Sequence, residues 1–439
     1  MSLFFLLYFI IIAIHIKNKG YRLLINPLFW LGVFWALIFG VYFTSGIRYK
    51  YGLSIWLCLF LIACIYGFLV KYRKGLVSSV RTFVKERKVA VRKWLLIGLF
   101  GTILYIFDYL RLNGFNLRKT TTEISFIGTL GALMLPVLLV IGIYLNCTSI
   151  RNKGKFHIGG IALMFLYGFP CIMNAGREAF LFIVIGMISL LGYRSILSKT
   201  KEKTKTNNTK MKFRTKLSLI IVSGIFLVGA LYVIFVVSVN RFTDNEINSL
   251  LAASDMSSKS MNEASSWGIF EFLYYNIASY FSHQIPFLDQ TLQEYRGPFL
   301  GGLFELNIIS RRLPDFLGLD YNLAFMEEEN IFNRSGESFA GGWNTVIGSF
   351  IIDFTWIGAI IACSICGYYI GVIQKKFIKT KDSRYATLLS LVCLCSFSTI
   401  QLGPFFQTNL YSSFIWWYIL FHRYEKRISN NDSNNSIKL

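Results

Sequence analysis

The residues best suited to chemistry are arginines that lie beside long apolar runs. One of them, Arg177, begins such a run. Five others lie in a long segment between two apolar runs, at Arg241, Arg296, Arg311, Arg312 and Arg334. A guanidinium group stays charged at any working pH and presents a fixed fork of donors that matches phosphate oxygens. These arginines therefore predict an anionic ligand.

Three more ionisable residues could take part. Glu178 follows Arg177, Asp353 lies inside the apolar run 346–373, and His283 is the only histidine of the long segment. Ionisable groups at membrane depth are candidates for function, because a partner or a wet cavity must offset their desolvation. An imidazole has an unperturbed pKa of about 6.5, which suits the removal of a proton from an attacking hydroxyl near neutral pH.

Each of these residues also has a structural alternative. Arg177 could extend to lipid headgroups or pair with the neighbouring glutamate. Asp353 could cap a half-helix, and Arg311 and Arg312 could form a surface pair on an amphipathic helix. His283 could be a hydrogen-bonded side chain at the membrane interface. A binding role is the hypothesis for the arginines, and His283 is the candidate base.

A lipid-linked diphosphate is the anionic ligand that suits such a site best. The diphosphate is a better leaving group when cations neutralise the negative charge that develops on it as the bond to it breaks. The sequence has no D-x-D, H-E-x-x-H or G-x-x-x-x-G-K-[ST] motif, so it indicates neither metal-dependent nor nucleoside-triphosphate chemistry. Cys363 and Cys366 have the spacing of zinc ligands but lack a second pair, and no metal site or cofactor is expected.

The elements that position these residues must be membrane helices. Hydrophobic residues make up 54% of the 439 residues, which excludes an ordinary water-facing surface. Peptide groups in a bilayer must be paired internally, so repeated apolar stretches of about 20 residues predict helices. The sequence thus predicts an all-α, polytopic transmembrane bundle. Its charge of +22 lies in short blocks between apolar runs, so nucleic acid is not an expected partner.

Eleven apolar runs are candidate spans. They cover residues 2–16, 27–45, 53–70, 94–109, 125–147, 157–173, 178–193, 217–239, 346–373, 386–402 and 408–422. The segment 267–288 is also apolar but contains Glu271, Asn276 and His283, which favours a re-entrant or interfacial amphipathic helix and would raise the count to 12 or 13 if it crossed.

Lysine and arginine asymmetry predicts the orientation of the spans. Alternate connections carry 33 of the 45 basic residues, and basic connections are retained on the cytoplasmic side. The amino terminus is therefore expected outside the cytoplasm and the carboxyl terminus inside it. Four regions follow: an N-terminal bundle of about eight spans at 1–239, a large outer loop at 240–345, C-terminal spans at 346–422 and a disordered tail at 423–439.

The outer loop and its borders resemble a known family. Pro286-Phe287-Leu288-Asp289, Gly297-Pro298-Phe299-Leu300-Gly301-Gly302-Leu303 and Ile352-Asp353-Phe354 follow one another in an order similar to that of the bacterial oligosaccharide repeat-unit polymerases, the Wzy or O-antigen polymerase family. The Gly176-Arg177 step is also similar. Thr355 stands where relatives often have glycine, and no glycine lies eleven residues after Arg177 or Arg296, where some members carry one.

The resemblance implies a metal-independent glycosyltransferase with a membrane-embedded, GT-C-like fold in the bacterial cytoplasmic membrane. It would move a growing glycan from its undecaprenyl diphosphate carrier onto a new lipid-linked repeat unit at the periplasmic face, to build a surface polysaccharide, expected to be O-antigen. The expected catalytic residues are Arg177, His283 and Arg296. The expected substrate-binding residues are Glu178, Arg241, Asp289, Arg311, Arg312 and Asp353.

Partners and rival functions follow from the same resemblance. Membrane lipids, a chain-length regulator and a flippase are the expected partners besides the lipid-linked oligosaccharide. The first rival function is an O-antigen ligase that transfers finished glycan to lipid A core. The second is a polysaccharide flippase or other transporter, which would be expected to show two similar halves and more charges at mid-membrane depth.

Overall fold

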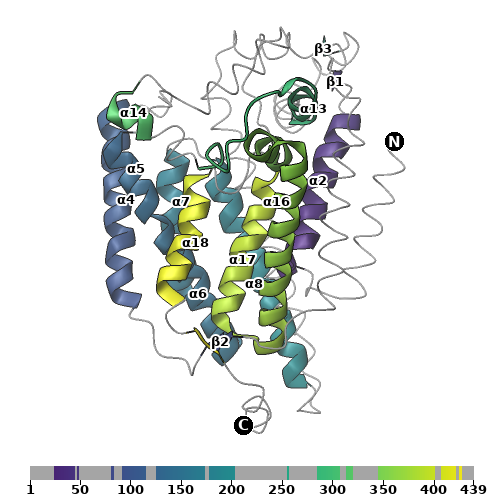
Figure 1. The fold of residues 1–439 in the computed structure, drawn as a ribbon. Helices are drawn as coiled ribbons and strands as arrows, with labels where there is room; N and C mark the ends of the chain where they lie inside the picture. Colours follow the sequence, from purple (N-terminus) through teal and green to yellow (C-terminus); the bar gives the residue numbers. More distant parts are fainter. Residues whose placement is uncertain are drawn as a thin grey trace, which may run out of the picture.

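The computed structural model is helical almost throughout the part of the chain that it describes (Figure 1). The described residues are 24–44, 47–48, 81–83, 91–114, 125–173, 177–202, 255–256, 284–306, 313–319, 345–400, 407–421 and 425–427. Three of the predicted apolar runs, 2–16, 53–70 and 217–239, lie outside them, as does most of the segment 267–288. Every other predicted run coincides with one or two helices.

Long helices form a bundle along one axis, and two short helices lie near one of its ends (Figure 1). The helices of the bundle are α2 (Pro27–Thr44), α4 (Val91–Asn113), α5 (Phe126–Met134), which continues into α6 (Pro136–Lys153), α7 (Ile158–Met173), α8 (Arg177–Glu202), α16 (Thr345–Thr380), α17 (Ser383–Ser398) and α18 (Thr408–Phe421). The short helices are α13 (Gln284–Glu294) and α14 (Leu313–Leu317).

Several helices have the length and composition of membrane spans. Four stretches qualify among the described residues: Val91–Leu112, Phe126–Lys153, Leu181–Ser198 and Thr345–Thr380. Shorter apolar helices cover Pro27–Gly40, Ile158–Cys171 and Ser383–Ser398. A helix pairs its own peptide groups, which the hydrocarbon core of a bilayer requires. The prediction of a helical membrane protein is confirmed at this level.

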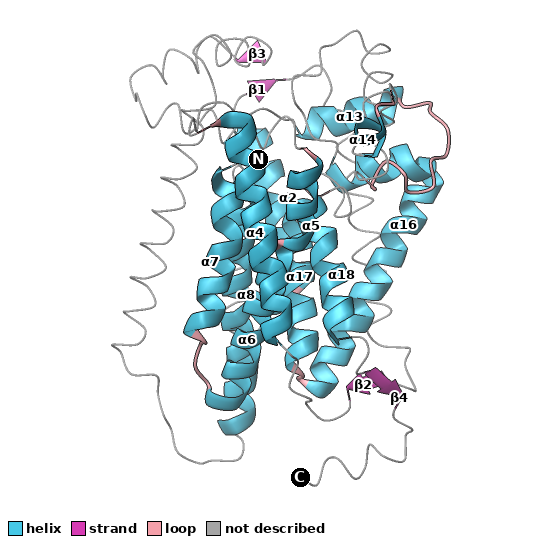
Figure 2. Cartoon of the chain, turned by 90° about the vertical axis from the view of Figure 1, so that its left-hand side faces the viewer, coloured by secondary structure: helices cyan, strands magenta, loops and turns pink. Residues whose placement is uncertain are grey.

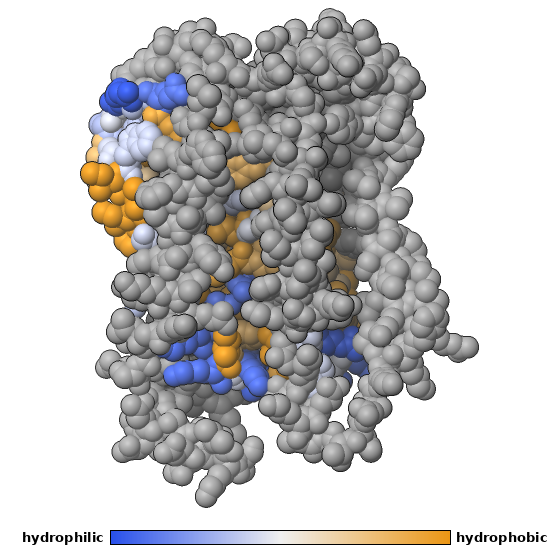
Figure 3. All heavy atoms as spheres, turned by 90° about the vertical axis from the view of Figure 1, so that its right-hand side faces the viewer, coloured by the Kyte–Doolittle hydropathy of each residue, from blue (hydrophilic) through white to orange (hydrophobic). Residues whose placement is uncertain are grey.

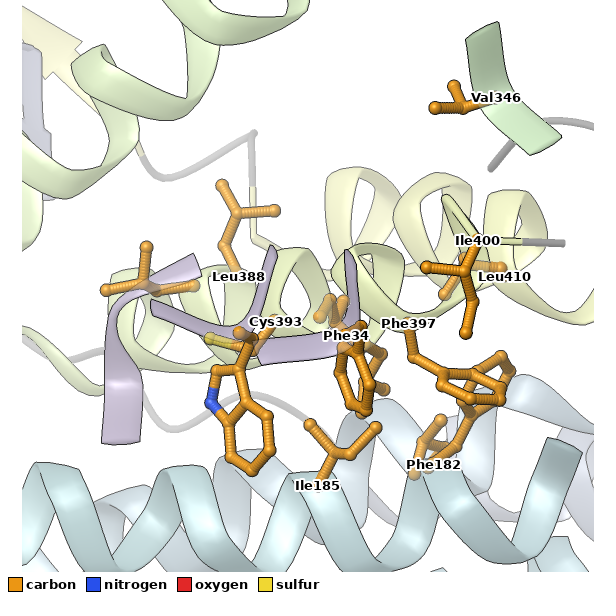
Figure 4. Packing of buried hydrophobic residues seen from close by; sticks show 14 of the residues in the cluster. Phe34, Phe182, Ile185, Val346, Leu388, Cys393, Phe397, Ile400 and Leu410 are labelled. Atoms are coloured by element: carbon orange, nitrogen blue, oxygen red, sulfur yellow. The ribbon is translucent and has the colours of Figure 1, made fainter. Parts of the chain in front are cut away.

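Helix α17 lies at the centre of the bundle. Leu388, Cys393 and Phe397 of this helix pack among side chains from α2, α8 and α18 (Figure 4). The rings of Phe34 and Phe397 meet edge to face with their centroids 5.1 Å apart. A hydrogen bond of 2.8 Å between the hydroxyls of Ser189 and Ser390 joins α8 to α17. Ser396 donates to the Pro27 carbonyl of α2 at 3.0 Å, and Thr387 donates to the Ser383 carbonyl in its own helix at 2.8 Å.

The two ends of the bundle differ in charge. Most of the described lysines and arginines lie at one end, here called the basic end, in the connections α6–α7 and α16–α17, the start of α4 and the end of α8. The opposite end, here called the loop end, carries α13, α14 and the loop 295–306 (Figure 2). The basic connections of the described helices therefore lie together at one end of the bundle, and the orientation of that end in a membrane stays a prediction.

A buried ion pair fixes the connection between α16 and α17 at the basic end. Asp382 caps α17 by accepting the Arg384 N–H at 2.8 Å, and its carboxylate also accepts both forks of the Arg384 guanidinium at 3.0 Å. Arg384 is 3% exposed, and Arg151 approaches the same carboxylate at 3.6 Å. Apolarity alone predicts the start of this helix at residue 386, whereas the ion pair allows it to begin at Ser383.

Two short antiparallel ladders connect distant segments. Strand β1 (Ile47–Arg48) pairs with β3 (Asp255–Met256), and β2 (Arg81–Phe83) pairs with β4 (Glu425–Arg427). Within the predicted tail 423–439, Glu425–Arg427 is held by backbone pairing at the basic end, and the rest of the tail lies outside the described residues. Periodicity gave no signal for a strand of three residues.

Candidate functional site at the loop end

Helix α16 is broken near its loop end, and this break organises the candidate site. Thr355 has φ 62° and ψ −176°, so the 36 residues of α16 form a half-helix before it and a long helix after it. The half-helix lies across the top of the bundle, and the long helix descends toward the basic end (Figures 1 and 2). The apolar run 346–373 predicts one continuous span, and that prediction is wrong at Thr355.

The break leaves the last carbonyls of the half-helix without helical partners. The loop 295–306 supplies them. The backbone N–H groups of Leu300 and Gly301 donate to the Asp353 carbonyl at 2.9 and 3.0 Å. The Tyr295 hydroxyl lies 2.7 Å from the Ile352 carbonyl and 3.0 Å from that of Pro298, and donates to them. The loop therefore completes the hydrogen bonding of the broken helix.

The carboxylate of Asp353 holds the same loop a second time. It accepts the N–H groups of Gly302, Phe304 and Glu305 at 3.1, 2.8 and 2.9 Å. Asp353 itself is 0% exposed. A negative charge near the carboxyl end of a helix opposes the helix dipole, so burial there needs strong compensation. Three convergent backbone N–H groups provide it, as in an anion-binding nest.

Two glycines let the loop wrap so tightly around one side chain. Gly301 has φ 66° and Gly302 has φ 97°, a region that residues with a Cβ rarely adopt. A Cβ at Gly302 would lie at an ordinary contact distance of 3.6 Å from the ring of Phe354, so the backbone angles and not the available space call for glycine. The pair is therefore required by backbone geometry, which explains why consecutive glycines follow Leu300 in the sequence.

The anchored loop presents one cation and several apolar side chains. Arg296 is exposed, and its Nη1 donates to the Tyr295 carbonyl at 2.8 Å. Phe299 is 66% exposed and packs its ring 6.0 Å from that of Phe354. Leu303 is also exposed. The backbone of this loop is fixed while Arg296, Phe299 and Leu303 face outward, which is the arrangement expected of a binding surface.

The structure places five of the predicted site residues at the loop end: Arg177, Glu178, Asp289, Arg296 and Asp353. Arg296 and Asp353 are 57 residues apart in sequence, and Arg296 belongs to the loop whose backbone Asp353 binds. Helix α8 begins at Arg177 at the same end, and Asp289 lies in α13. The side chains of Arg177, Glu178 and Asp289 lie outside the described part of the chain. The other predicted site residues, His283, Arg241, Arg311 and Arg312, also lie outside it.

One buried carboxyl group of the site was not predicted. Glu305 is 3% exposed, and its backbone N–H is one of the donors to Asp353. Its place in the long polar segment gave no reason to single it out among 14 acidic residues. The glycine pair four positions upstream was the available signal, because two glycines before an apolar-acidic pair indicate a tight turn.

The arrangement suits recognition of a phosphate at a membrane surface. An exposed guanidinium on a fixed loop can bind phosphate oxygens with little loss of conformational entropy. The carboxylate of Asp353 is occupied by its three backbone donors, so it acts here on the loop. Comparisons of the chain with protein-family models, with curated proteins and with solved structures find no match.

Proposed function

We propose that this protein is a membrane glycosyltransferase that polymerises undecaprenyl-diphosphate-linked oligosaccharide repeat units into a surface polysaccharide, O-antigen in the first instance. The observation that carries the proposal is the exposed Arg296 on a loop fixed by Asp353 at the end of a broken apolar helix. The resemblance of residues 286–303 and 352–354 to the repeat-unit polymerases supports the same conclusion.

The proposal includes an orientation and an architecture. The basic end faces the cytoplasm and the loop end faces the periplasm, in agreement with the retention of lysine and arginine on the cytoplasmic side. The chain spans the bacterial cytoplasmic membrane eleven times in a GT-C-like arrangement, with the amino terminus periplasmic and the carboxyl terminus cytoplasmic. The site then lies on the face where lipid-linked glycans are extended.

The proposed reaction needs few protein groups. A hydroxyl of the new repeat unit attacks the anomeric carbon of the growing glycan, and the bond from that carbon to the diphosphate oxygen breaks. Arg296, with Arg177 at the start of α8, stabilises the charge that gathers on the departing polyprenyl diphosphate. His283 takes the proton of the attacking hydroxyl. No cofactor enters this scheme.

Deletion of the protein, followed by analysis of the lipid-linked glycan, tests the proposal. We expect single capped repeat units to accumulate, because their supply continues while their joining stops. Long polymer that stays on its carrier would instead identify a ligase. Repeat units trapped on the cytoplasmic side would identify a flippase, and either result would replace the polymerase function.

A further inference from the structure

The loop end carries apolar side chains that no described residue covers. Phe299 and Leu303 of the loop are exposed, as are Trp356 and Ile357 just after the break in α16. The ring contact between Phe299 and Phe354 joins the loop to the end of the half-helix, one residue before the break at Thr355. Figure 3 shows hydrophobic atoms at the upper left edge of the molecule, below hydrophilic ones. Phe299 and Leu303 of the loop, together with Trp356 and Ile357 just after the break beside Phe354, are here called the lip.

The lip continues into a face of α16 suited to lipid. Ile357, Ile361, Ile365 and Tyr369 are all at least half exposed, and they follow one another at intervals of four residues. Such spacing places side chains on one face of a helix. In an apolar helix of a membrane protein this face lies against acyl chains. The lip is thus the upper part of a lipid-facing surface.

The length of the long helix sets the depth of the lip. Residues 356–380 extend for about 37 Å at about 1.5 Å per residue, whereas the hydrocarbon core is about 30 Å thick. The helix ends in Lys376 and Lys379, which belong at the opposite headgroup layer. Trp356 therefore lies at the headgroup boundary of the loop end, where tryptophan is favoured.

A cation stands beside this apolar surface. Arg296 is three residues from Phe299 in a loop whose backbone is fixed by Asp353. An amphipathic molecule with a long apolar chain and an anionic phosphate head matches both parts at once. A protein partner would need a polar rim around the apolar residues, whereas the lip passes directly into the lipid-facing stripe of α16.

We propose that the lip binds a polyprenyl diphosphate of the outer leaflet, with the isoprenoid chain along Phe299, Leu303 and Ile357 and the diphosphate on Arg296. This inference rests on the proposed function and adds to it the surface along which the lipid carrier lies. The loop is held in place before the lipid arrives, so binding needs no ordering of its backbone.

Photo-crosslinking in lipid nanodiscs tests this proposal. The full chain is reconstituted in phosphatidylcholine with a small fraction of polyprenyl diphosphate, and benzoylphenylalanine replaces Phe299. The matched control replaces Phe126, which is 56% exposed at the start of α5. We expect polyprenyl diphosphate to be crosslinked at position 299 and about tenfold less at position 126. Arg296→Gln should reduce the labelling at 299 about tenfold, whereas Arg296→Lys should retain most of it.

Four results would overturn the proposal: equal labelling at the two positions, labelling unaffected by Arg296→Gln, equally strong labelling by phosphatidylglycerol, or adducts with a second copy of this chain instead of lipid. The assay measures binding without turnover. It therefore separates failure of the lip from failure of the polymerase function, which the glycan analysis reports.

Discussion

The backbone N–H of Phe304 lies 2.8 Å from Oδ1 of Asp353, although the two residues are 49 positions apart in the chain. Phe304 is one of five residues between Leu300 and Glu305 whose N–H groups donate to Asp353. Asp353 therefore holds residues 300–305 of the long polar segment against α16, beside the bond of the Tyr295 hydroxyl to the Ile352 carbonyl.

Asp353→Asn should loosen the loop and reduce glycan extension. An amide offers one acceptor oxygen, so the N–H of at least one donor residue loses its partner, at a cost of about 1–3 kcal/mol. We expect a lower midpoint of thermal unfolding in detergent and shorter glycan ladders. Asp108→Asn is the matched control, because Asp108 is another buried carboxylate that accepts the N–H and hydroxyl of Ser125. Normal ladders in the first variant, or equal loss in both, would contradict this role.

Thr355→Gly should stabilise the protein. The backbone of Thr355 lies in a region that is accessible almost only to glycine, which costs about 1–3 kcal/mol for another residue. Glycine loses about 0.5–1 kcal/mol through the entropy of the unfolded chain, so relief of strain dominates. The unfolding midpoint should rise. Thr129→Gly inside α5 should lower it instead, and a fall in both variants would show that position 355 is unstrained.

Arg296→Gln should abolish most chain extension while the amount of protein in the membrane stays normal. The substitution removes the charge that the fixed loop presents to a phosphate, and hydrogen bonds to charged groups contribute about 1.5–3 kcal/mol. Arg296→Lys should retain part of the activity. Arg111→Gln provides the control, since Arg111 is exposed in the last turn of α4 at the same end. Glycan ladders of wild-type length from Arg296→Gln would contradict the proposed role of Arg296 in phosphate binding.

Cysteine labelling should assign the two ends to opposite sides of the membrane. A membrane-impermeant maleimide added to spheroplasts should label Leu319→Cys at the loop end but not Lys155→Cys at the basic end. Both positions are exposed and lie in connections between helices. After permeabilisation both should react. Labelling of position 155 alone in intact spheroplasts would invert the proposed orientation.

Asp382→Asn should destabilise the basic end strongly. Arg384 is buried, and removal of its charged partner leaves an uncompensated guanidinium, which typically costs about 3–5 kcal/mol. The asparagine can still cap α17, so the loss reports the ion pair rather than the cap. The double variant Asp382→Asn, Arg384→Met should recover much of the stability in thermal unfolding. A double variant less stable than Asp382→Asn would contradict this account.

The sequence predicted helix positions well where apolarity alone determines them. The run 408–422 became α18 (Thr408–Phe421), and 157–173 became α7, because a stretch without charges in lipid has only the helix available. The break at Thr355 was not predicted. Nothing in the residues Asp-Phe-Thr-Trp lowers local helix propensity enough, and the loop that satisfies the freed carbonyls comes from 50 residues upstream.

The candidate site was predicted in part. Arg296 and Asp353 were singled out from their chemistry, but their connection was not, because it passes through backbone N–H groups that every residue possesses. Asp353 was predicted to bind substrate, and capping of a half-helix was the alternative considered. Its observed contacts are with the loop, and the role of His283 stays a prediction outside the described residues.

The attachment of the loop at Asp353 also bears on how such a surface can change over generations. Asp353 contacts peptide groups, so the exposed side chains at 299 and 303 take no part in the attachment itself. A lineage can therefore replace them to suit a new sugar or lipid while the carboxylate and the two glycines keep the loop in register. The surface of this short loop can therefore diverge rapidly while its attachment at Asp353 is kept.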